Sequence, residues 1–547
     1  MKIQKYKLVL FAIIVLAAVL RFYLLGTNPP SLDWDETAEG YNAYSLLKTG
    51  KDEYGYKLPL SFRSFDDYKP PLYIYMTVPS VALFGLNDFA VRFPSAFLGV
   101  FAVLFCYLMV FELFKNRPTA LLSALFLAIS PWHLQFSRVG FETNSTILWS
   151  TLGVWAFLKG TKAKGARIML WMCLASLSFG LNLFMYHNSR VFIPLFAIAL
   201  LILFKDKLLS VKKYLIIPAV IATIFSVVLS PVIFSIQGQL RYDATTVFSD
   251  RSALYKTSDK IEVDRKYGIL LVGKILHNRR FVYVPTIIGN YLSHFNPTFL
   301  FFSDSFDNTA NRHHVPGLAM LYWWDIPFIL AGIYFVIKNK LIFQSKIIIF
   351  AWFLLSPVAA SVTWGSPHAL RSEIFLPTFQ IFTAIGVYTI YTYTKRKKLF
   401  IIVAGTLLIM NFTYYLHQYY VHMPLEYSKD WIYGRKHAAL ISDLLKSRYD
   451  RVIVSTKLEQ PHEFWLYYLK YDPKKYLNEG GTVSGGFLED RNHFDKFFFK
   501  PIDFNKQSGE AKTLFVGIPS EFPQNAKILE KVDYLNGEPA IYIVSGE

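Results

Sequence analysis

Long runs of apolar residues recur from the start of the chain to near residue 420, and short polar segments separate them. A helix needs about 20 mostly apolar residues to cross the ~30 Å hydrocarbon core of a bilayer. By this measure the pattern predicts about eleven membrane-spanning helices. They lie near residues 8–25, 91–113, 117–132, 144–159, 167–185, 191–205, 214–233, 318–337, 345–362, 373–394 and 399–417.

Two segments between the apolar runs are too long to be simple connections. The first outer loop, residues 26–90, contains an apolar stretch from Pro70 to Leu86 that prolines interrupt, which predicts an interfacial helix rather than a span. The large outer loop covers residues 234–317. Loops of such length are usually functional, so both segments are candidates for a site.

The pattern changes after residue 422. An amphipathic helical pattern, RKHAALISDLLKSR, is followed by the strand-like runs DRVIVST, TLFVGI and AIYIVS and by the turn sequence LNGEP. We therefore divide the chain into a transmembrane catalytic domain, residues 1–422, and a small α/β domain, residues 423–547.

Composition supports a membrane protein and excludes a soluble one. Hydrophobic residues make up 53% of the 547 positions and charged residues 18%, whereas soluble domains carry about 25% charged residues. The formal net charge of +18 does not require nucleic acid as a partner, because residues 423–547 are nearly balanced in charge. The basic excess lies in short gaps between apolar runs, as the positive-inside bias produces.

This bias also orients the chain. With a cytoplasmic N-terminus, every predicted inner gap is basic, for example KRKK at 395–398. The loop 26–90 and the domain 423–547 then lie on the outer face of the cell membrane. We therefore expect a multi-pass protein whose site and α/β domain are extracytoplasmic.

Carboxylates are concentrated in SLDWDETAEG, directly after the first predicted span. Asp35 and Glu36 lie between apolar residues at the predicted beginning of a surface helix, where a partly desolvated carboxylate can act as a general base toward a hydroxyl. Solvated loop acids are the alternative interpretation. Asp33 is interpreted as such a solvated cap.

Cationic residues recur on the same predicted face. Lys69 precedes two prolines in DDYKPPLYIY, where it is either a snorkelling lysine or a cation at headgroup level. Arg138 lies with Glu142 in SPWHLQFSRVGFETN, and His368 lies with Arg371 in WGSPHALRSE. Each segment is compatible with a polar capped loop. Together they predict a phosphate-binding cavity, because cations are expected to be scarce on an outer face.

The ordered motifs RFYLLGTNPPSLDWDE, KPPLYIY, FAVRFPSAFLG, SPWHLQFSRVGFETN, YLSHFNPTFLF, PHALRS and MPLEYSKDWIYGRK resemble glycosyltransferase family 39 over most of residues 10–436. This family contains protein O-mannosyltransferases and aminoarabinose transferases. The resemblance implies a GT-C fold and a polyprenyl-phosphate sugar donor. It also implies that Asp35 and Glu36 serve catalysis, that Glu142 or a near neighbour is a second cavity acid, and that Lys69 contacts the donor phosphate. Assigning Arg138, His368 and Arg371 to that phosphate extends the resemblance.

The resulting hypothesis is an inverting transfer of a sugar to a hydroxyl of a protein, lipid or glycan acceptor, with Asp35 as the base and the four cations at the departing phosphate. A divalent metal is compatible with this chemistry but is not required, because phosphate leaves with charge already on it. The alternative from another class is a transporter or flippase of lipid-linked sugars. Transporters, however, tend to show internal repeats and charged positions at the bilayer midplane, and neither pattern is evident in the sequence.

Overall fold

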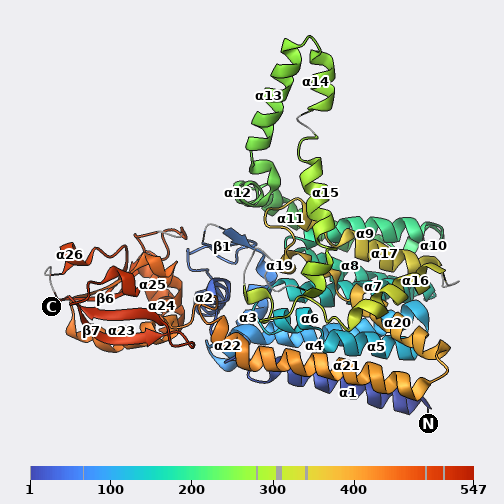
Figure 1. Cartoon of the computed structure of the whole chain (residues 1–547), viewed down its shortest axis with the longest axis horizontal. Coiled ribbons are helices and arrows are strands. Elements are labelled where there is room, and N and C mark those ends of the chain that lie inside the picture. The colour runs from blue at the N-terminus through green and yellow to red at the C-terminus, as the bar shows by residue number, and fades with distance from the viewer. Residues whose placement is uncertain are drawn as a thin grey trace.

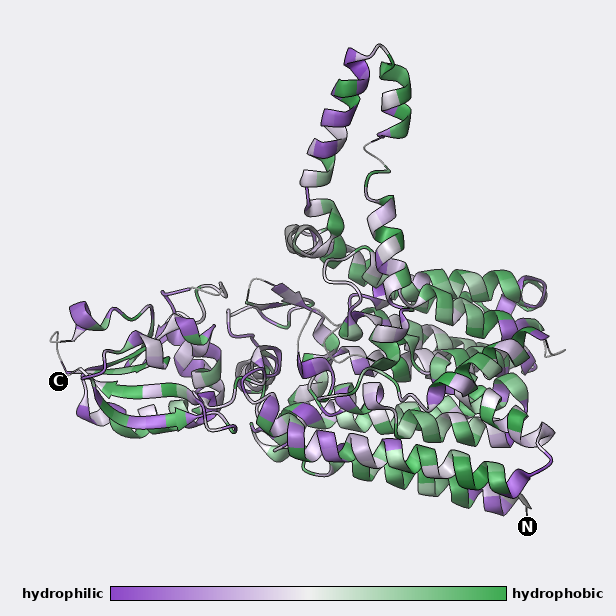
Figure 2. Cartoon of the chain, viewed as in Figure 1, coloured by the Kyte–Doolittle hydropathy of each residue, from purple (hydrophilic) through white to green (hydrophobic). Residues whose placement is uncertain are grey.

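The computed structural model describes residues 2–65, 67–278, 281–302, 311–338, 343–486, 489–508 and 512–546. Long helices lie side by side in a bundle, and a mixed α/β unit sits at one end of it (Figure 1). Apolar residues dominate along the helices of the bundle, whereas polar residues are more frequent in the α/β unit (Figure 2). The fold is thus that of a multi-pass membrane protein with a polar region at one end.

Each predicted span coincides with a helix. These helices are α1 (Lys2–Phe22), α4 (Asp88–Phe114), α5 (Arg117–Ala128), α7 (Thr143–Lys162), α8 (Ala166–Leu183), α9 (Ser189–Leu203), α11 (Ile216–Phe234), α16 (Asp325–Lys338), α17 (Phe343–Leu355), α20 (Thr378–Tyr393) and α21 (Lys397–His417). Within the described residues, five helices are long and apolar enough to cross a membrane, or up to seven if each of two bent pairs is one span. The count of eleven therefore stays a prediction.

Proline explains the two bends. Helix α5 continues into α6 (Pro131–Ser137) at an angle of 56°, and the segment 369–375 continues into α20 at 49°. Pro131 and Pro377 lie at these breaks. Proline has no N–H to donate to the preceding turn, so the helical hydrogen bonds are interrupted at these two points.

The first outer loop folds against the end of the bundle. Helix α2 (Trp34–Thr49) begins at Asp33, whose side chain accepts from the backbone N–H of Glu36, and it ends at Gly50 in the left-handed region, with φ +70°. A short antiparallel pair, β1 (Phe62–Ser64) and β2 (Asp67–Lys69), leads into α3 (Pro71–Phe84). The predicted helices at the acidic stretch and after the two prolines are both confirmed.

The large outer loop is mostly helical. It contains α12 (Ile236–Thr245), α13 (Ser252–Lys266), α14 (Leu270–Leu276) and α15 (Val284–Ser293). Helices α13 and α14 form a hairpin that projects away from the bundle, toward the top of the view in Figure 1. Helix α12 stays close to the body and contacts β2. This contact brings the large loop to the segment that carries Lys69.

The C-terminal unit is built on a six-stranded mixed sheet in the order β4-β5-β3-β6-β8-β7. Its strands are β3 (Arg451–Val454), β4 (His493–Phe494), β5 (Phe497–Phe499), β6 (Thr513–Gly517), β7 (Lys527–Asp533) and β8 (Pro539–Ser545). Its main helices are α23 (Arg435–Leu445), α24 (Pro461–Tyr468) and α25 (Pro473–Asn478). The predicted amphipathic helix and the three predicted strands are confirmed.

The first outer loop and the α/β unit share one hydrophobic core. Tyr41 of α2 and Trp465 of α24 belong to the same buried cluster. Gly40 lies so close to α24 that a Cβ atom there would be 2.6 Å from the Tyr467 ring. Only glycine allows this approach, because that distance is below any real carbon contact. The α/β unit that is predicted to begin at residue 423 therefore packs against α2, which belongs to the segment before that boundary.

Candidate active site

The acids of the segment SLDWDETAEG lie in the first turns of α2, but their environments differ. Asp33 caps the helix and is buried, with its Oδ2 3.6 Å from Arg312 Nη1. The interpretation of Asp33 as a solvated cap is therefore half wrong: it is a cap, but burial raises its pKa to about 7 despite the charge of Arg312. Arg312 also stacks over Trp34, with its guanidinium 4.5 Å from the ring centroid, and so covers the beginning of the helix.

Glu36 is completely buried in a fixed set of contacts. Its carboxylate accepts from Arg92 at 2.8 and 3.0 Å and from the backbone N–H of Gly140 at 2.8 Å. It also accepts from the Asp33 N–H to complete a capping box. Glu36 therefore joins α2 to α4 and to the loop before α7. These contacts argue against the predicted direct catalytic role and favour a positioning role.

Asp35 is oriented differently and forms the most accessible ion pair of the site. Its Oδ2 lies 2.6 Å from Lys69 Nζ, which is also 3.8 Å from Glu142 Oε1. The Asp35 side chain is 37% exposed, against 10% for Lys69 and 4% for Glu142. Burial alone would lower the pKa of Lys69, but Asp35, Glu142 and Glu39 together raise it well above its usual value. Lys69 is therefore a permanent cation between two acids from different elements.

Glu39 is an acid of this site that the sequence did not single out. It lies one turn after Asp35 on α2, is buried, and has no hydrogen-bond partner among the described residues. Burial raises its pKa well above the usual value, and the neighbouring Glu142 raises it further. Glu39 therefore binds a proton more readily than an exposed glutamate does. Its helical spacing of four from Asp35 was the available signal.

Arg138 does not fit its predicted contact with phosphate. Its five N–H donors are used: Nε donates to the Tyr419 hydroxyl, and the two terminal nitrogens donate to the carbonyls of Leu20, Arg21, Tyr23 and Asn28. The guanidinium also stacks on Tyr419. Because arginine has only five donors, none is left for a phosphate. Arg138 instead anchors the end of α1 to the loop after α6.

Arg371 lines a cavity of about 610 Å³ next to the β2 strand. Its Nη1 donates to the Thr363 hydroxyl at 2.9 Å and to the Trp364 carbonyl at 2.6 Å. His368 is not among the residues that line this cavity. It caps the short helix α19 (Ala369–Ser372), where its Nδ1 accepts from the Arg371 N–H. The two predicted cations are thus neighbours, and Arg371 is the one at the cavity.

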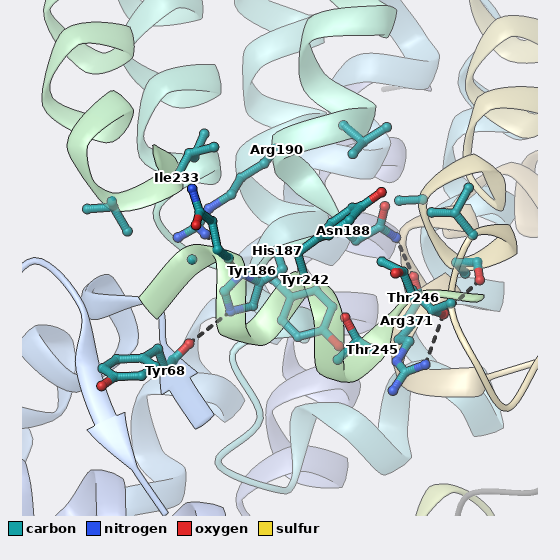
Figure 3. Close-up of a pocket in the computed structure, with 18 of the residues that line it drawn as sticks. Tyr68, Tyr186, His187, Asn188, Arg190, Ile233, Tyr242, Thr245, Thr246 and Arg371 are labelled. Atoms are coloured by element: carbon teal, nitrogen blue, oxygen red, sulfur yellow. Dashed lines mark hydrogen bonds between the residues drawn. The ribbon is translucent and has the colours of Figure 1, made fainter. Parts of the chain in front are cut away.

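A second cation of this cavity, Arg190, was not identified from the sequence. Arg190 Nη1 donates to His187 Nδ1 at 2.9 Å, and His187 Nε2 lies 3.1 Å from the Tyr68 carbonyl oxygen (Figure 3). Since Nδ1 accepts, the proton of a neutral imidazole is on Nε2. Arg190 is therefore linked through His187 to the residue before Lys69. The sequence around Arg190 and His187 contains no motif that would mark either of them as a residue of the site.

The rest of the lining explains what the cavity can bind. Val232, Ile233 and Phe234 of α11 form an apolar wall, while Arg190 and Arg371 line the same cavity. An anionic headgroup with a hydrocarbon tail matches both parts, because cations favour phosphate and the apolar wall favours the chain.

Among the described residues near Asp35, no set of histidine, cysteine and carboxylate ligands has metal-binding spacing.

Comparisons with known proteins bear on the fold and on the family resemblance. Residues 68–230 match the family described as dolichyl-phosphate-mannose-protein mannosyltransferase. The structure of ArnT from Cupriavidus metallidurans bound to undecaprenyl phosphate superposes with a TM-score of 0.57 at 13% identity, over 98% of both chains. The chain has the GT-C glycosyltransferase fold. The family match confirms the resemblance to glycosyltransferase family 39 for residues 68–230.

Two further proteins show how far the similarity extends. AglB, the archaeal oligosaccharyltransferase from Archaeoglobus fulgidus, was solved in complex with an inhibitory peptide and a dolichol-phosphate; it superposes with a TM-score of 0.52 at 13% identity, over 85% of this chain and 64% of AglB. An uncharacterized protein of Aquifex aeolicus (strain VF5) is 31% identical over 127 residues. That match spans 23% of this chain and about a quarter (24%) of the relative.

Proposed function

We propose that this protein is an integral-membrane glycosyltransferase that moves a sugar from a polyprenyl-phosphate donor to an acceptor hydroxyl. Two observations carry the proposal: the partly exposed Asp35 carboxylate is held at 2.6 Å from Lys69, and Tyr68, the residue before Lys69, lines a cavity with two arginines and an apolar wall. The match to a dolichyl-phosphate-mannose-dependent family supports the donor class. So do the lipid phosphates bound to the similar folds of ArnT and AglB.

In the proposed reaction, the acceptor oxygen attacks the anomeric carbon and its proton passes to Asp35. The bond between that carbon and the phosphate oxygen breaks, and the bonding electrons leave with the phosphate. Lys69 and Arg371 stabilise the departing phosphate. A single displacement of this kind inverts the anomeric configuration. Lys69 must move from Asp35 toward the phosphate, which frees the carboxylate to accept the proton.

The other acids support this centre without touching the reacting atoms. Glu36 fixes α2 relative to α4, so Asp35 keeps its place when Lys69 moves. Glu142, 3.8 Å from Lys69, keeps the lysine charged while Asp35 is being protonated. The roles proposed for Asp35, Glu142, Lys69 and Arg371 therefore follow the sequence prediction, whereas those of Glu36 and Arg138 are changed to positioning and anchoring.

The site is proposed to face the outside of the cell. The basic gaps of the sequence place the N-terminus and KRKK on the cytoplasmic side, which supports an extracytoplasmic loop 26–90 and α/β unit. The acceptor is then a protein, lipid or glycan of the cell envelope. Nucleic acid has no part in this function.

The direct test is to incubate the purified protein in detergent with a panel of polyprenyl-phosphate sugars and to measure release of polyprenyl phosphate. We expect release with at least one donor and a strong loss in the Asp35→Asn variant. Asp503→Asn, an exposed acid of the α/β unit, is the matched control and should behave as the wild type. Equal activity of the two variants would contradict the proposal.

A further inference from the structure

Three ionisable side chains lie together where the first outer loop meets the α/β unit, away from the proposed active site. Glu53 follows the C-terminal end of α2, and His462 and Glu463 lie in the first turn of α24. Helix α2 packs against both α24 and α25. The three residues therefore come from two segments that are far apart in the sequence and meet only in the folded protein.

All three side chains are removed from water. Glu53 and Glu463 have no exposed surface, and His462 is 2% exposed. Within the described part of the chain, neither oxygen of Glu463 has a hydrogen-bond partner, and neither does Nε2 of His462. A buried carboxylate without partners is costly unless it is neutralised or coordinates a cation. The cluster thus has unused ligand atoms aimed at one another.

Glu53 is held in place by the residues around it. Its Oε1 accepts from Asn42 of α2 at 2.9 Å, and its Oε2 accepts from the Thr482 hydroxyl at 2.7 Å. Its backbone N–H donates to the Asn42 side chain. Each carboxylate oxygen still has a lone pair for a further bond. Hydrogen bonds of this kind typically orient the ligands of a metal ion.

The spacing of the ligand atoms fits one small cation. One atom from each of Glu53, His462 and Glu463 can be chosen so that all three lie within 4.8 Å of one another. His462 Nε2 and Glu463 Oε1 are 3.6 Å apart. Ligands bound tetrahedrally at the usual zinc distances are about 3.4 Å apart, so only small side-chain adjustments would close the set.

We propose that Glu53, His462 and Glu463 bind one divalent cation of the zinc class, which fastens α2 to the α/β unit. One imidazole and two carboxylates are ligands that Zn²⁺ accepts. With a neutral imidazole, the two carboxylate charges balance the charge of the ion. The site lies at the other end of the helix that carries Asp35, so the ion would fix the position of α2.

Without a cation, the same cluster would have to hold a proton. Burial raises the pKa of Glu463 to about 7 and lowers the pKa of His462 to about 4. Two carboxyl groups that share a proton beside a neutral imidazole are therefore the competing state. That state requires no metal, so metal content distinguishes the two.

The experiment uses the full-length protein in detergent, stripped with a chelator and dialysed against Zn²⁺. We expect one retained equivalent of zinc by elemental analysis and an increase of about 2–4 °C in the thermal midpoint, since a ligand of the folded state stabilises it by mass action. Co²⁺ in place of Zn²⁺ should give visible d–d absorption. Wild-type protein that retains no zinc and shows no such absorption would overturn the proposal in favour of a shared proton.

Variants assign the ligands. Glu463→Gln and His462→Gln should lose zinc retention and the zinc-dependent midpoint shift. Glu479→Gln, an exposed acid at the end of α25, should keep both. If either cluster variant elutes as an aggregate, the Co²⁺ spectrum of the wild type still decides the matter. Zinc retention that is unchanged in both cluster variants would contradict these ligands. This outcome is independent of glycosyltransferase activity, so either proposal can fail alone.

Discussion

Two consecutive residues of α2 face two different regions of the molecule. Toward α4, Glu36 and Arg92 form an ion pair with no exposed surface on either side chain. Toward β2, Asp35 and Lys69 form a similarly short pair, but 37% of the Asp35 side chain is exposed. Both are acid–base contacts below 3 Å, so distance does not separate their roles. Exposure does, because only a substrate that reaches a carboxylate can lose a proton to it.

The largest effect on stability is expected on the buried side. Arg92→Ala should lower the free energy of unfolding by about 3–5 kcal/mol, because it leaves the Glu36 charge buried without its partner. Thermal unfolding in detergent measures this effect. A loss as small as that of an exposed pair would mean that Glu36 is protonated or hydrated there, and the contrast between the two faces of α2 would fail.

On the exposed side, Lys69→Ala should act on binding. It removes a charge-assisted contact worth about 1.5–3 kcal/mol, so the protein should bind donor and free polyprenyl phosphate more weakly by similar factors. Lys57→Ala changes an exposed lysine of the same loop and serves as control. Unchanged affinity for free polyprenyl phosphate in Lys69→Ala would show that Lys69 serves only to hold Asp35.

A smaller loss of stability is expected from a substitution at Gly140, whose backbone N–H contacts Glu36. In Gly140→Ala the new Cβ would lie 3.2 Å from Glu36 Cγ and 3.3 Å from Val91 Cγ1, so the variant should lose about 1 kcal/mol of stability through crowding. Gly405→Ala in α21 meets nothing within 4 Å and should gain slightly, since alanine favours helix. Thermal midpoints of the two variants should therefore shift in opposite directions.

The smallest effect is expected for an ion pair at the surface of the same region. Lys436 Nζ lies 3.0 Å from Asp88 Oδ2, but 47% of the lysine side chain is exposed. Solvent and salt screen such a pair, so Lys436→Ala should cost about 0–1 kcal/mol. A loss comparable to that of Arg92→Ala would show that burial does not rank these ion pairs.

Local patterns were enough to predict many elements of this fold. Apolar runs of about twenty residues located the helices of the bundle, and runs rich in β-favouring residues located β3, β6 and β8. The number of membrane crossings was harder to predict from the sequence than the positions of the helices. Helix α9 is shorter than a span, and proline bends two others, so an apolar run does not fix how a helix lies in the membrane.

The sequence singled out residues of the proposed site only where they lie in short motifs. Asp35 and Lys69 were proposed because each stands in a distinctive local sequence. The division of roles between Asp35 and Glu36 was not accessible, because the contacts that bury Glu36 come from positions 56 and 104 residues further along. The surroundings of Arg138 were not accessible for the same reason: a basic residue in a loop carries no sign that a distant hydroxyl and distant carbonyls accept from all its donors.

The most direct test of the account is to measure turnover, donor affinity and thermal midpoint side by side for Asp35→Asn and Glu36→Gln. Asp35→Asn keeps the size of the side chain but removes the proton acceptor, so we expect turnover to fall by about 10² to 10⁴ with little change in donor affinity or midpoint. Glu36→Gln should instead lower the midpoint. Asp35→Asn with nearly full turnover, or Glu36→Gln with full stability and lost turnover, would contradict the roles assigned to the two acids.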